Sequence, residues 1–258
     1  MILYPNAKIN IGLKVIEKRP DGFHNLETFF FPIGLTDILE IVESEKTTLT
    51  LYGICLEGRQ EDNLCIKAYE LLSKDFNLPP VEIHLFKRIP PGAGLGGGSS
   101  DAAHTLIALN KLFCINLSSE TLAQYSARLG SDCPFFVYSN GLNSEEGEGM
   151  LANGRGEILT PFKVPQLKGL KIKTVVPPVF VSTADAYRGV TPQIPQYSLR
   201  DQLLMPVEGW KETVRNDFES SVFKKHPLIE EHKQDLYNKG AIYASMSGSG
   251  SAVFGLFR

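Results

Sequence analysis

Residues 90–103 read Pro-Pro-Gly-Ala-Gly-Leu-Gly-Gly-Gly-Ser-Ser-Asp-Ala-Ala, and apolar residues with helical spacing follow them. Glycine loses more backbone freedom on folding than any other residue, so the glycines of 92–98 are costly to order. A closely curled backbone presents successive N–H groups to phosphate oxygens, and the next helix adds its own unpaired N–H groups. The segment therefore predicts an anion-binding loop of polyphosphate size, with Ser99, Ser100 and Asp101 at the helix cap.

Composition and length describe an ordinary globular chain. It has 258 residues, of which 43% are hydrophobic and 21% charged, enough for a sizeable core. The net charge of -3 does not suggest a nucleic-acid partner, and no apolar run approaches the roughly 20 residues that span a bilayer. No basic segment followed by an apolar one begins the chain, so we expect a cytoplasmic protein with no membrane partner.

The cysteines carry no pattern of a metal site or a redox pair. Cys55, Cys65, Cys114 and Cys133 are far apart in the sequence and form no C-x-x-C pair. This spacing predicts reduced, mostly buried thiols and argues against zinc. No histidine lies near Cys133 in the sequence, so we expect no nucleophilic role for it.

Strand and helix patterns alternate irregularly, which favours an α+β fold over a doubly wound parallel sheet. Apolar and polar residues alternate over 9–15, the pattern of a strand with one buried face. Residues 141–156 are rich in Gly, Glu and Asn and predict a loop, with a domain boundary near residue 155. Further strands are expected at 35–42, 48–52, 81–86, 170–176 and 252–257, and helices at 62–75, 101–113, 118–129, 214–223 and 229–238.

Three other interpretations of the glycine segment fit it less well. The Walker type needs G-x-x-x-x-G-K-[ST], but Gly98 stands where the lysine is required. The dinucleotide fingerprint G-x-G-x-x-G is matched, but it should follow a strand directly, and residues 87–91 intervene. A flexible linker is disfavoured because Ser-Ser-Asp and an apolar helix come after the glycines.

The segment 90–103 resembles the P-x-x-x-G-L-G-S/G-S-S signature of the GHMP small-molecule kinases. Residues 5–13 resemble the first motif of that family, P-A-K-I/L-N-L-x-L, and residues 19–26 resemble its R-x-D-G-Y/F-H-x-L stretch. Residues 130–136 are similar to its G-A/S-D-V-P-F/V-F segment, with a cysteine in place of the valine. Residues 246–254 resemble its third, glycine-rich motif.

Two weaker matches complete an ordered set. Residues 61–64 resemble the E-D-N-L stretch near the adenine site, and residues 182–187 resemble the substrate-domain S-T-x-x-A-Y/F segment. Only a few residues follow the third motif, where the family usually adds a last helix. The resemblance implies a two-domain GHMP kinase fold of the α+β class. It implies a ribosomal protein S5 domain 2-like, ATP-binding domain over 1–155 and a ferredoxin-like, substrate-binding domain over 156–258.

The resemblance also implies what the chain binds and which residues act. The set is most similar to the branch that transfers phosphate from ATP, with Mg²⁺, to the 2-hydroxyl of 4-diphosphocytidyl-2-C-methyl-D-erythritol in the non-mevalonate isoprenoid route. Catalysis is then expected of Lys8 and of Asp132 as proton acceptor, and Ser99 or Ser100 is expected to face Mg²⁺. ATP is expected at Pro90, Pro91, Gly92, Ala93, Gly94, Leu95, Gly96, Gly97, Gly98, Ser99, Ser100, Asn63 and Lys87, and the substrate at Asn10, Phe23, His24, Thr183 and Tyr187.

Taken without the family, the same residues permit plainer roles. Lys8 and Asn10 share the polar face of a strand, where most such pairs are solvated, and Asp132 after a helix stop is typical of a cap or turn. Three rival functions stay open: a kinase for another alcohol such as mevalonate, homoserine or a sugar, a non-catalytic nucleotide sensor, and a dehydrogenase. We expect a monomer or a weak homodimer.

Overall fold

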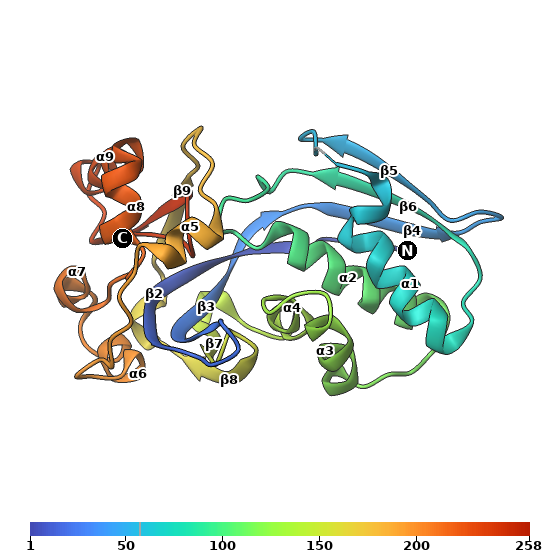
Figure 1. The fold of residues 1–258 in the computed structure, drawn as a ribbon, viewed down its shortest axis with the longest axis horizontal. Helices are drawn as coiled ribbons and strands as arrows, with labels where there is room; N and C mark the ends of the chain where they lie inside the picture. Colours follow the sequence, from blue (N-terminus) through green and yellow to red (C-terminus); the bar gives the residue numbers. More distant parts are fainter. Residues whose placement is uncertain (57) are drawn as a thin grey trace. The chain divides into compact units, whose positions relative to one another are not determined.

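The computed structural model describes residues 1–56 and 58–258 and contains both helices and strands (Figure 1). The strands are β1 (Ile2–Leu3), β2 (Asn6–Lys18), β3 (His24–Thr36), β4 (Ile38–Glu43), β5 (Thr48–Gly53), β6 (Val81–Lys87), β7 (Glu148–Asn153), β8 (Ile158–Lys163), β9 (Lys171–Val175), β10 (Tyr243–Met246) and β11 (Val253–Phe257). The α-helices are α1 (Leu64–Phe76), α2 (Gly97–Leu112), α3 (Ser119–Ala127), α4 (Cys133–Ser139), α5 (Thr183–Arg188), α6 (Leu199–Leu203), α7 (Trp210–Thr213), α8 (Glu219–Lys225) and α9 (Pro227–Asn238).

The chain divides into two compact units that interleave along the sequence. The first unit comprises residues 1–7, 34–91 and 96–141, and the second comprises 8–33, 92–95 and 142–258. These units do not coincide with a single boundary near residue 155, because most of β2, most of β3 and residues 92–95 of the glycine segment belong to the second unit. The domain limits 1–155 and 156–258 stay a prediction.

The first unit is built on a mixed sheet with strand order β1-β4-β6-β5. Strand β6 pairs antiparallel with β4 and parallel with β5, which aligns Ile41 and Leu49 with Ile83. These residues are buried, whereas the next residues along each strand alternate toward the other face, as the strand period of two requires. Helix α2 packs against β4 and against α1 and covers the apolar face (Figure 1).

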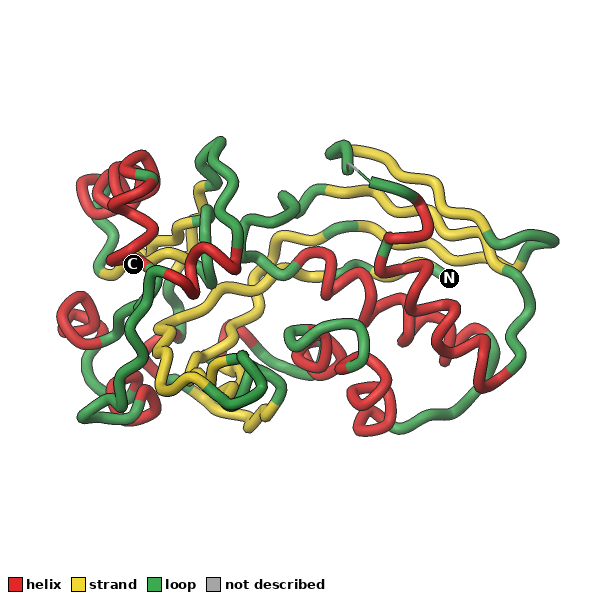
Figure 2. Tube along the Cα trace, in the orientation of Figure 1, coloured by secondary structure: helices red, strands yellow, loops and turns green. Residues whose placement is uncertain are grey.

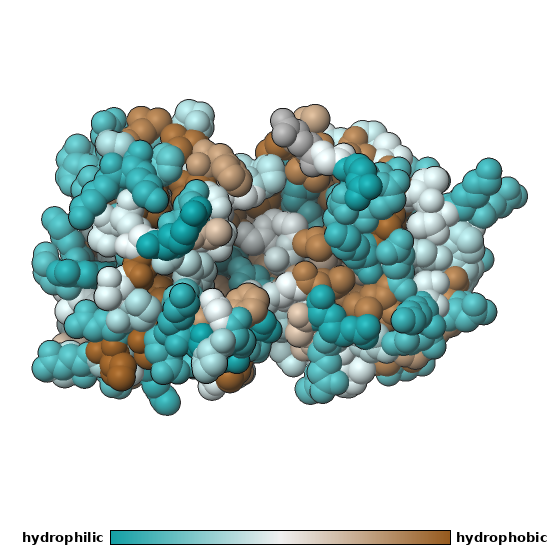
Figure 3. All heavy atoms as spheres, viewed as in Figure 1, coloured by the Kyte–Doolittle hydropathy of each residue, from teal (hydrophilic) through white to brown (hydrophobic). Residues whose placement is uncertain are grey.

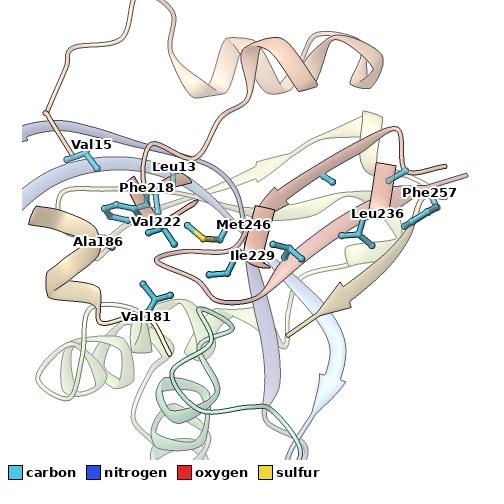
Figure 4. Packing of buried hydrophobic residues seen from close by; sticks show 13 residues of the cluster. Leu13, Val15, Val181, Ala186, Phe218, Val222, Ile229, Leu236, Met246 and Phe257 are labelled. Atoms are coloured by element: carbon cyan, nitrogen blue, oxygen red, sulfur yellow. The ribbon is translucent and has the colours of Figure 1, made fainter. Parts of the chain in front are cut away.

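The second unit contains an antiparallel sheet with strand order β10-β11-β9, on which α9 packs. Leu13 and Val15 of β2 belong to the same buried cluster as Phe218, Met246 and Phe257 (Figure 4). Burying apolar area contributes about 25 cal/mol per Å², so this cluster supplies much of what holds β2 beside the C-terminal segment.

The sheet with strand order β2-β3-β7-β8 contains β7, β8 and most of β3, where the sequence predicted no strand. Residues 141–156 were predicted to be loop, but Glu148–Asn153 form β7, which pairs with β3 and β8. A Cβ on Gly149 would lie 2.5 Å from both Phe29 Cζ and the Phe30 carbonyl oxygen. Glycine therefore marks a close approach of two strands here rather than a flexible segment.

The helix predicted at 214–223 is interrupted. Helix α7 ends at Thr213 and α8 begins at Glu219, because the intervening backbone pairs with β2 instead. The Leu13 N–H donates to the Arg215 carbonyl, and the Asp217 N–H donates to the Leu13 carbonyl, each at 2.9 Å. A tertiary pairing has overridden a local helical pattern, which sequence periodicity alone does not detect.

The surface shown in Figure 3 is mostly hydrophilic, with apolar side chains gathered in separate patches. Figure 2 shows as loop the connection 189–198 between α5 and α6, which carries the exposed Ile194 and Tyr197. This connection is tied to β2, since the Gln193 N–H donates to the Val15 carbonyl at 2.9 Å. Among the described residues, no helix combines the length and the apolar character that crossing a membrane requires.

Substituting Gly149 by alanine tests the close packing of β7. The added methyl group meets both a ring and a backbone carbonyl, and overpacking of this kind typically costs about 1–3 kcal/mol. We expect the free energy of unfolding, measured by urea titration, to fall by about that amount. Gly209→Ala is the control, because nothing lies within 4 Å of a Cβ there and its φ is -87°. Equal stability of the two variants would contradict this packing.

Candidate active site

Strand β2 is buried on both faces, so the prediction of one buried face is wrong. Its apolar face enters the cluster of the second unit, yet Lys8 is only 3% exposed and Asn10 only 2%. Burying an ammonium group is costly unless acceptors replace the water that it loses. The acceptors that surround the Lys8 ammonium therefore show which part of the chain this buried charge stabilises.

The Lys8 ammonium is anchored to the glycine segment. Its Nζ donates to Asn10 Oδ1 at 2.5 Å and to the Gly94 carbonyl oxygen at 3.1 Å. It also lies 5.0 Å from the centroid of the Phe30 ring, within the range of a cation–π interaction. Two residues separated by 86 positions in the sequence are thus joined through one cation.

Asn10 is held in turn by neighbours within the second unit. Its side-chain amide donates to Thr28 Oγ1 at 3.0 Å, and Thr28 Oγ1 donates to the Gly12 carbonyl at 2.6 Å. Its backbone N–H donates to Ser247 Oγ at 3.2 Å. Because the amide oxygen faces Lys8, Asn10 acts first as a partner of the ammonium, and the substrate contact predicted for it stays a prediction.

Residues 92–95 form the part of the glycine segment that belongs to the second unit. Gly92 and Gly94 have φ values of +64° and +78°, which glycine adopts without the strain that other residues incur. Ala93 and Leu95 are held by hydrogen bonds to neighbouring backbone. The Ala252 N–H donates to the Ala93 carbonyl, and the Lys8 N–H donates to the Leu95 carbonyl, each at 3.0 Å. A Cβ on Gly94 would lie 2.1 Å from the Ser247 carbonyl oxygen.

Helix α2 begins earlier than predicted. Gly96, with φ +73°, precedes its first residue, and Ser99, Ser100 and Asp101 lie inside the first turns rather than at the cap. The first-turn N–H groups of such a helix, with its dipole, favour an anion. Gly97 has no positive φ; its requirement is space, because a Cβ would lie 2.8 Å from the Ile89 side chain.

The two serines of this turn differ in what they can reach. Ser100 is fully buried, and its hydroxyl lies 3.4 Å from Nδ1 of the buried His104. Ser99 is half-buried and therefore retains access to solvent. Of the two hydroxyls predicted to face Mg²⁺, that of Ser99 has the access that a ligand needs.

A buried ion cluster lies beneath the start of α2 in the first unit. Lys87 is 2% exposed, and its ammonium pairs with Asp37 and, at 2.6 Å, with Asp101. Asp37 interrupts the predicted strand 35–42 between β3 and β4, and its second oxygen accepts from the Ile89 N–H at 2.8 Å. Lys87 was predicted to contact ATP; its ammonium is paired with both carboxylates under this turn, and the ATP contact stays a prediction.

Charge and burial oppose one another in this cluster. Burial alone would lower the pKa of the Lys87 ammonium, but the carboxylates of Asp101 and Asp37 raise it above its ordinary value. Burial and the neighbouring Asp37 charge raise the pKa of Asp101 to about 7, although Lys87 opposes this. Among the residues that the structure describes, none gives Asp101 Oδ1 a hydrogen bond, so one of its oxygens meets the full cost of desolvation.

Asp132 stands directly before α4, the position of a cap. Its side chain makes no capping hydrogen bond to the helix, so Asp132 does not act as a side-chain cap of α4. Cys133 follows it, fully buried, and burial raises the pKa of its thiol to about 12. A thiol that stays protonated is a poor nucleophile, as expected for Cys133.

Aromatic side chains of the second unit form a stack that the sequence analysis only partly predicted. His24 stacks on Tyr187, with ring centroids 4.9 Å apart and planes inclined by 20°, and Tyr187 meets Phe218 edge-on. Phe23, predicted as a partner of Tyr187 around a cytosine, contacts the Arg155 guanidinium at 4.9 Å. Burial and Lys18 lower the pKa of His24, which favours a neutral ring.

The remaining predicted residues have local roles that the structure defines. Asn63 caps α1, because its Oδ1 accepts from the Cys65 N–H at 2.9 Å. Thr183 begins α5, and its Oγ1 lies 3.2 Å from Ser249 Oγ in the third glycine-rich segment. The cysteines are free, but Cys55 and Cys114 are exposed, so the expectation of mostly buried thiols holds for half of them.

Two buried polar residues near the third motif were missed. Asn216 is 2% exposed, and its amide donates to the Met246 and Gly248 carbonyls, each at 2.8 Å. Ser247 Oγ donates to the Gly94 carbonyl at 2.8 Å. The available signal was the asparagine itself, because a polar residue inside a predicted amphipathic helix competes with the helical backbone.

Comparison with known proteins identifies the family. The family model described as GHMP kinases N terminal domain matches residues 63–140, and the one described as GHMP kinases C terminal matches residues 207–258. The 4-diphosphocytidyl-2-C-methyl-D-erythritol kinase of Bacteroides thetaiotaomicron is 52% identical over 261 residues, which cover 100% of this chain and 92% of the relative. The chain belongs to the GHMP kinase family.

Solved structures agree with that assignment. A crystal structure of 4-(cytidine 5'-diphospho)-2C-methyl-D-erythritol kinase superposes with a TM-score of 0.81 at 34% identity, covering 99% of this chain and 90% of that one. The phosphomevalonate kinase of Streptococcus pneumoniae superposes with a TM-score of 0.68 at 14% identity, covering 100% and 91%, which shows a common fold alone. The two-domain α+β fold is therefore confirmed, and the chain is a kinase that uses ATP as its phosphate donor.

Gly94→Ala tests the close approach of two glycine-rich segments. Alanine at a φ of +78° costs about 1–2 kcal/mol, and its methyl group also collides with the Ser247 carbonyl. We expect ATP affinity, measured by calorimetry, to fall at least about tenfold because the loop must move. Gly209→Ala again serves as the control. Unchanged ATP affinity in the folded Gly94→Ala protein would show that this turn does not hold the nucleotide.

Asp101→Asn tests the buried ion cluster through its pH dependence. The folded-state pKa of about 7 lies above the ordinary value of 3.8, so the stability from this group is fully present below the ordinary value. It is lost as the pH rises through about 7, because the folded carboxyl must then release its proton. Asparagine does not titrate.

We expect urea midpoints of the natural protein to fall between about pH 4 and pH 8 relative to those of Asp101→Asn. The other ionisable groups facing Asp101 are Lys87, Asp37 and the Cys65 thiol, whose pKa burial raises to about 12. These three residues are present in both the natural protein and Asp101→Asn. Parallel profiles would contradict the raised pKa.

Proposed function

We propose that this chain transfers the γ-phosphoryl group of ATP to the 2-hydroxyl of 4-diphosphocytidyl-2-C-methyl-D-erythritol, in the non-mevalonate route to isoprenoid precursors. The observation that carries the proposal is the Lys8 ammonium, buried and held at 3.1 Å on the carbonyl of Gly94. Relatives that bear the name of this kinase are 46–52% identical to the chain over its whole length.

Phosphoryl transfer asks a protein mainly for positioning and charge stabilisation. In the proposal, backbone N–H groups of residues 92–98 and the start of α2 bind the phosphates. Lys8 neutralises charge on the transferring group, and Asp132 accepts the proton of the attacking hydroxyl. Lys8 belongs to the second unit and Asp132 to the first, and their action on one phosphoryl group is part of the proposal.

Mg²⁺, when bound with ATP, would neutralise charge on the phosphates in this reaction. Such an ion keeps several waters and takes one or two protein ligands besides phosphate oxygens. Across the part of the chain that the structure describes, no group of three or more His, Cys, Asp or Glu side chains is placed to hold a metal by itself. The half-buried hydroxyl of Ser99 could serve as a single protein ligand to such an ion.

The substrate end of the proposal rests on the stacked pair His24 and Tyr187. A flat aromatic surface with a neutral imidazole suits a nucleobase, which gains about 1–3 kcal/mol from each stacking contact. Asn10, Phe23 and Thr183 stay predicted substrate contacts. The cytidine ring is the part of the substrate that such a surface recognises.

Phosphorus NMR tests the function directly. Incubation with ATP, Mg²⁺ and 4-diphosphocytidyl-2-C-methyl-D-erythritol should yield ADP and one new phosphomonoester resonance. Mevalonate, homoserine and a hexose serve as alternative acceptors, and a preference for one of them would overturn the substrate assignment. ATP binding without transfer to any acceptor would instead indicate a nucleotide sensor, and nicotinamide binding would indicate a dehydrogenase.

Asp132→Asn tests the proton acceptor. Asparagine keeps the size of the side chain but cannot accept the hydroxyl proton, so kcat should fall by about 10²-fold or more. Thermal unfolding, measured beside kcat, reports separately whether the substitution disturbs the fold. A variant with normal turnover would remove the proton acceptor from the mechanism while leaving the phosphate loop untouched.

Two further expectations are also proposals. We expect a monomer or a weak homodimer, which sedimentation velocity at several protein concentrations measures. We expect a cytoplasmic protein, which fractionation of the producing cell tests. Neither enters the mechanism.

A further inference from the structure

The Ser247 hydroxyl occupies a position between two parts of the proposed catalytic machinery. Ser247 is 0% exposed, and its Oγ accepts from the Asn10 N–H at 3.2 Å. It lies 2.8 Å from the Gly94 carbonyl oxygen and 3.4 Å from Asn10 Oδ1. A hydroxyl has one proton to donate, and the shorter distance assigns it to the Gly94 carbonyl.

Lys8 and Ser247 share both neighbours. The Lys8 ammonium donates to Asn10 Oδ1 and to the Gly94 carbonyl, the residues that Ser247 also joins. An ammonium on a four-carbon stem is flexible and directs its protons only where fixed acceptors hold them. Ser247 joins the Gly94 carbonyl to the backbone of Asn10, whose side chain is the other acceptor of the ammonium, and it thereby fixes the spacing of the two groups that direct Lys8.

Ser247 is itself clamped from both sides. The Asn216 amide donates to the carbonyls of the residues before and after it, Met246 and Gly248, while Asn216 Oδ1 accepts from the Phe218 N–H at 3.0 Å. The Ser247 N–H donates to the Ala252 carbonyl at 2.8 Å. Both printed donations of the Asn216 side-chain amide are thus used to hold the turn that carries Ser247, while its oxygen accepts from its own segment.

We propose that Ser247 is a positioning residue for phosphoryl transfer, which sets the Lys8 ammonium by bracing Asn10 against the Gly94 carbonyl. Asn216 holds the backbone on either side of it. The inference rests on the proposed function, because it assigns Ser247 an effect on a step in which Lys8 acts. A displacement of a catalytic group by about 1 Å can cost about 10²-fold in rate, so removing one brace is measurable.

Ser247→Ala, with Ser245→Ala as a matched control, tests the proposal. Ser245 is also a buried serine, but its hydroxyl donates to Glu219 Oε1 at 3.0 Å and not to the Lys8 neighbours. We expect Ser247→Ala to lower kcat about tenfold or more, with KM for ATP within about threefold of the natural value. Ser245→Ala should lose comparable stability but keep kcat within about threefold. Equal kcat values for the two variants would overturn the proposal.

A double-mutant cycle separates positioning from general damage. If Ser247 acts through Lys8, Ser247→Ala should have no further effect on kcat in the Lys8→Met background. The same fold-loss in both backgrounds would mean that Ser247 acts by another route, and the inference would fail. Loss of activity in Lys8→Met alone supports the proposed function independently. Normal activity of Lys8→Met would contradict the role of Lys8 in the proposed function before Ser247 is considered.

Ser247→Cys keeps the test decisive should the alanine variant not fold. The thiol has a similar shape but is a weak donor, so kcat should fall below the natural value, with normal thermal unfolding. Natural kcat in a folded Ser247→Cys protein would contradict a role for this hydrogen bond.

Discussion

The fold depends on the solvation of one buried cation. Lys8 lies on a strand whose two faces are both covered, and its ammonium is compensated by Asn10 Oδ1 and the Gly94 carbonyl. An unpaired ammonium in that position would cost several kcal/mol, so the strand and the glycine segment must fold together. The pairing joins residues 8 and 94, which belong to the same compact unit.

The first unit meets a related constraint in a different way. Two carboxyl groups and one ammonium are buried under the first turn of α2, and the pKa of Asp101, raised to about 7, limits the excess negative charge there. Such clusters contribute little net stability, but they fix geometry because every alternative leaves a charge unpaired. Lys87 and Asp101 therefore hold the start of the helix whose first N–H groups the proposal assigns to phosphate binding.

Much of this was accessible from the sequence because the glycine motif and its helix are local features. The motif order also indicated the family. Two of the missed features depend on contacts between segments that are distant in the sequence. Strand β7 contains Gly149, which lets two strands approach closely, and the helix predicted at 214–223 is broken because its backbone pairs with β2. The burial of Lys8 and the bonds of Asn216 depend on residues distant in sequence, which no local pattern contains.

Rapid-quench measurement of a single turnover by Lys8→Met, with ATP affinity measured separately by calorimetry, tests the central claim most directly. If the buried ammonium serves the transferring phosphoryl group, ATP should bind within about threefold of its natural affinity, while the transfer step slows by about 10²-fold or more. A transfer step that proceeds at the natural rate in Lys8→Met would contradict the account.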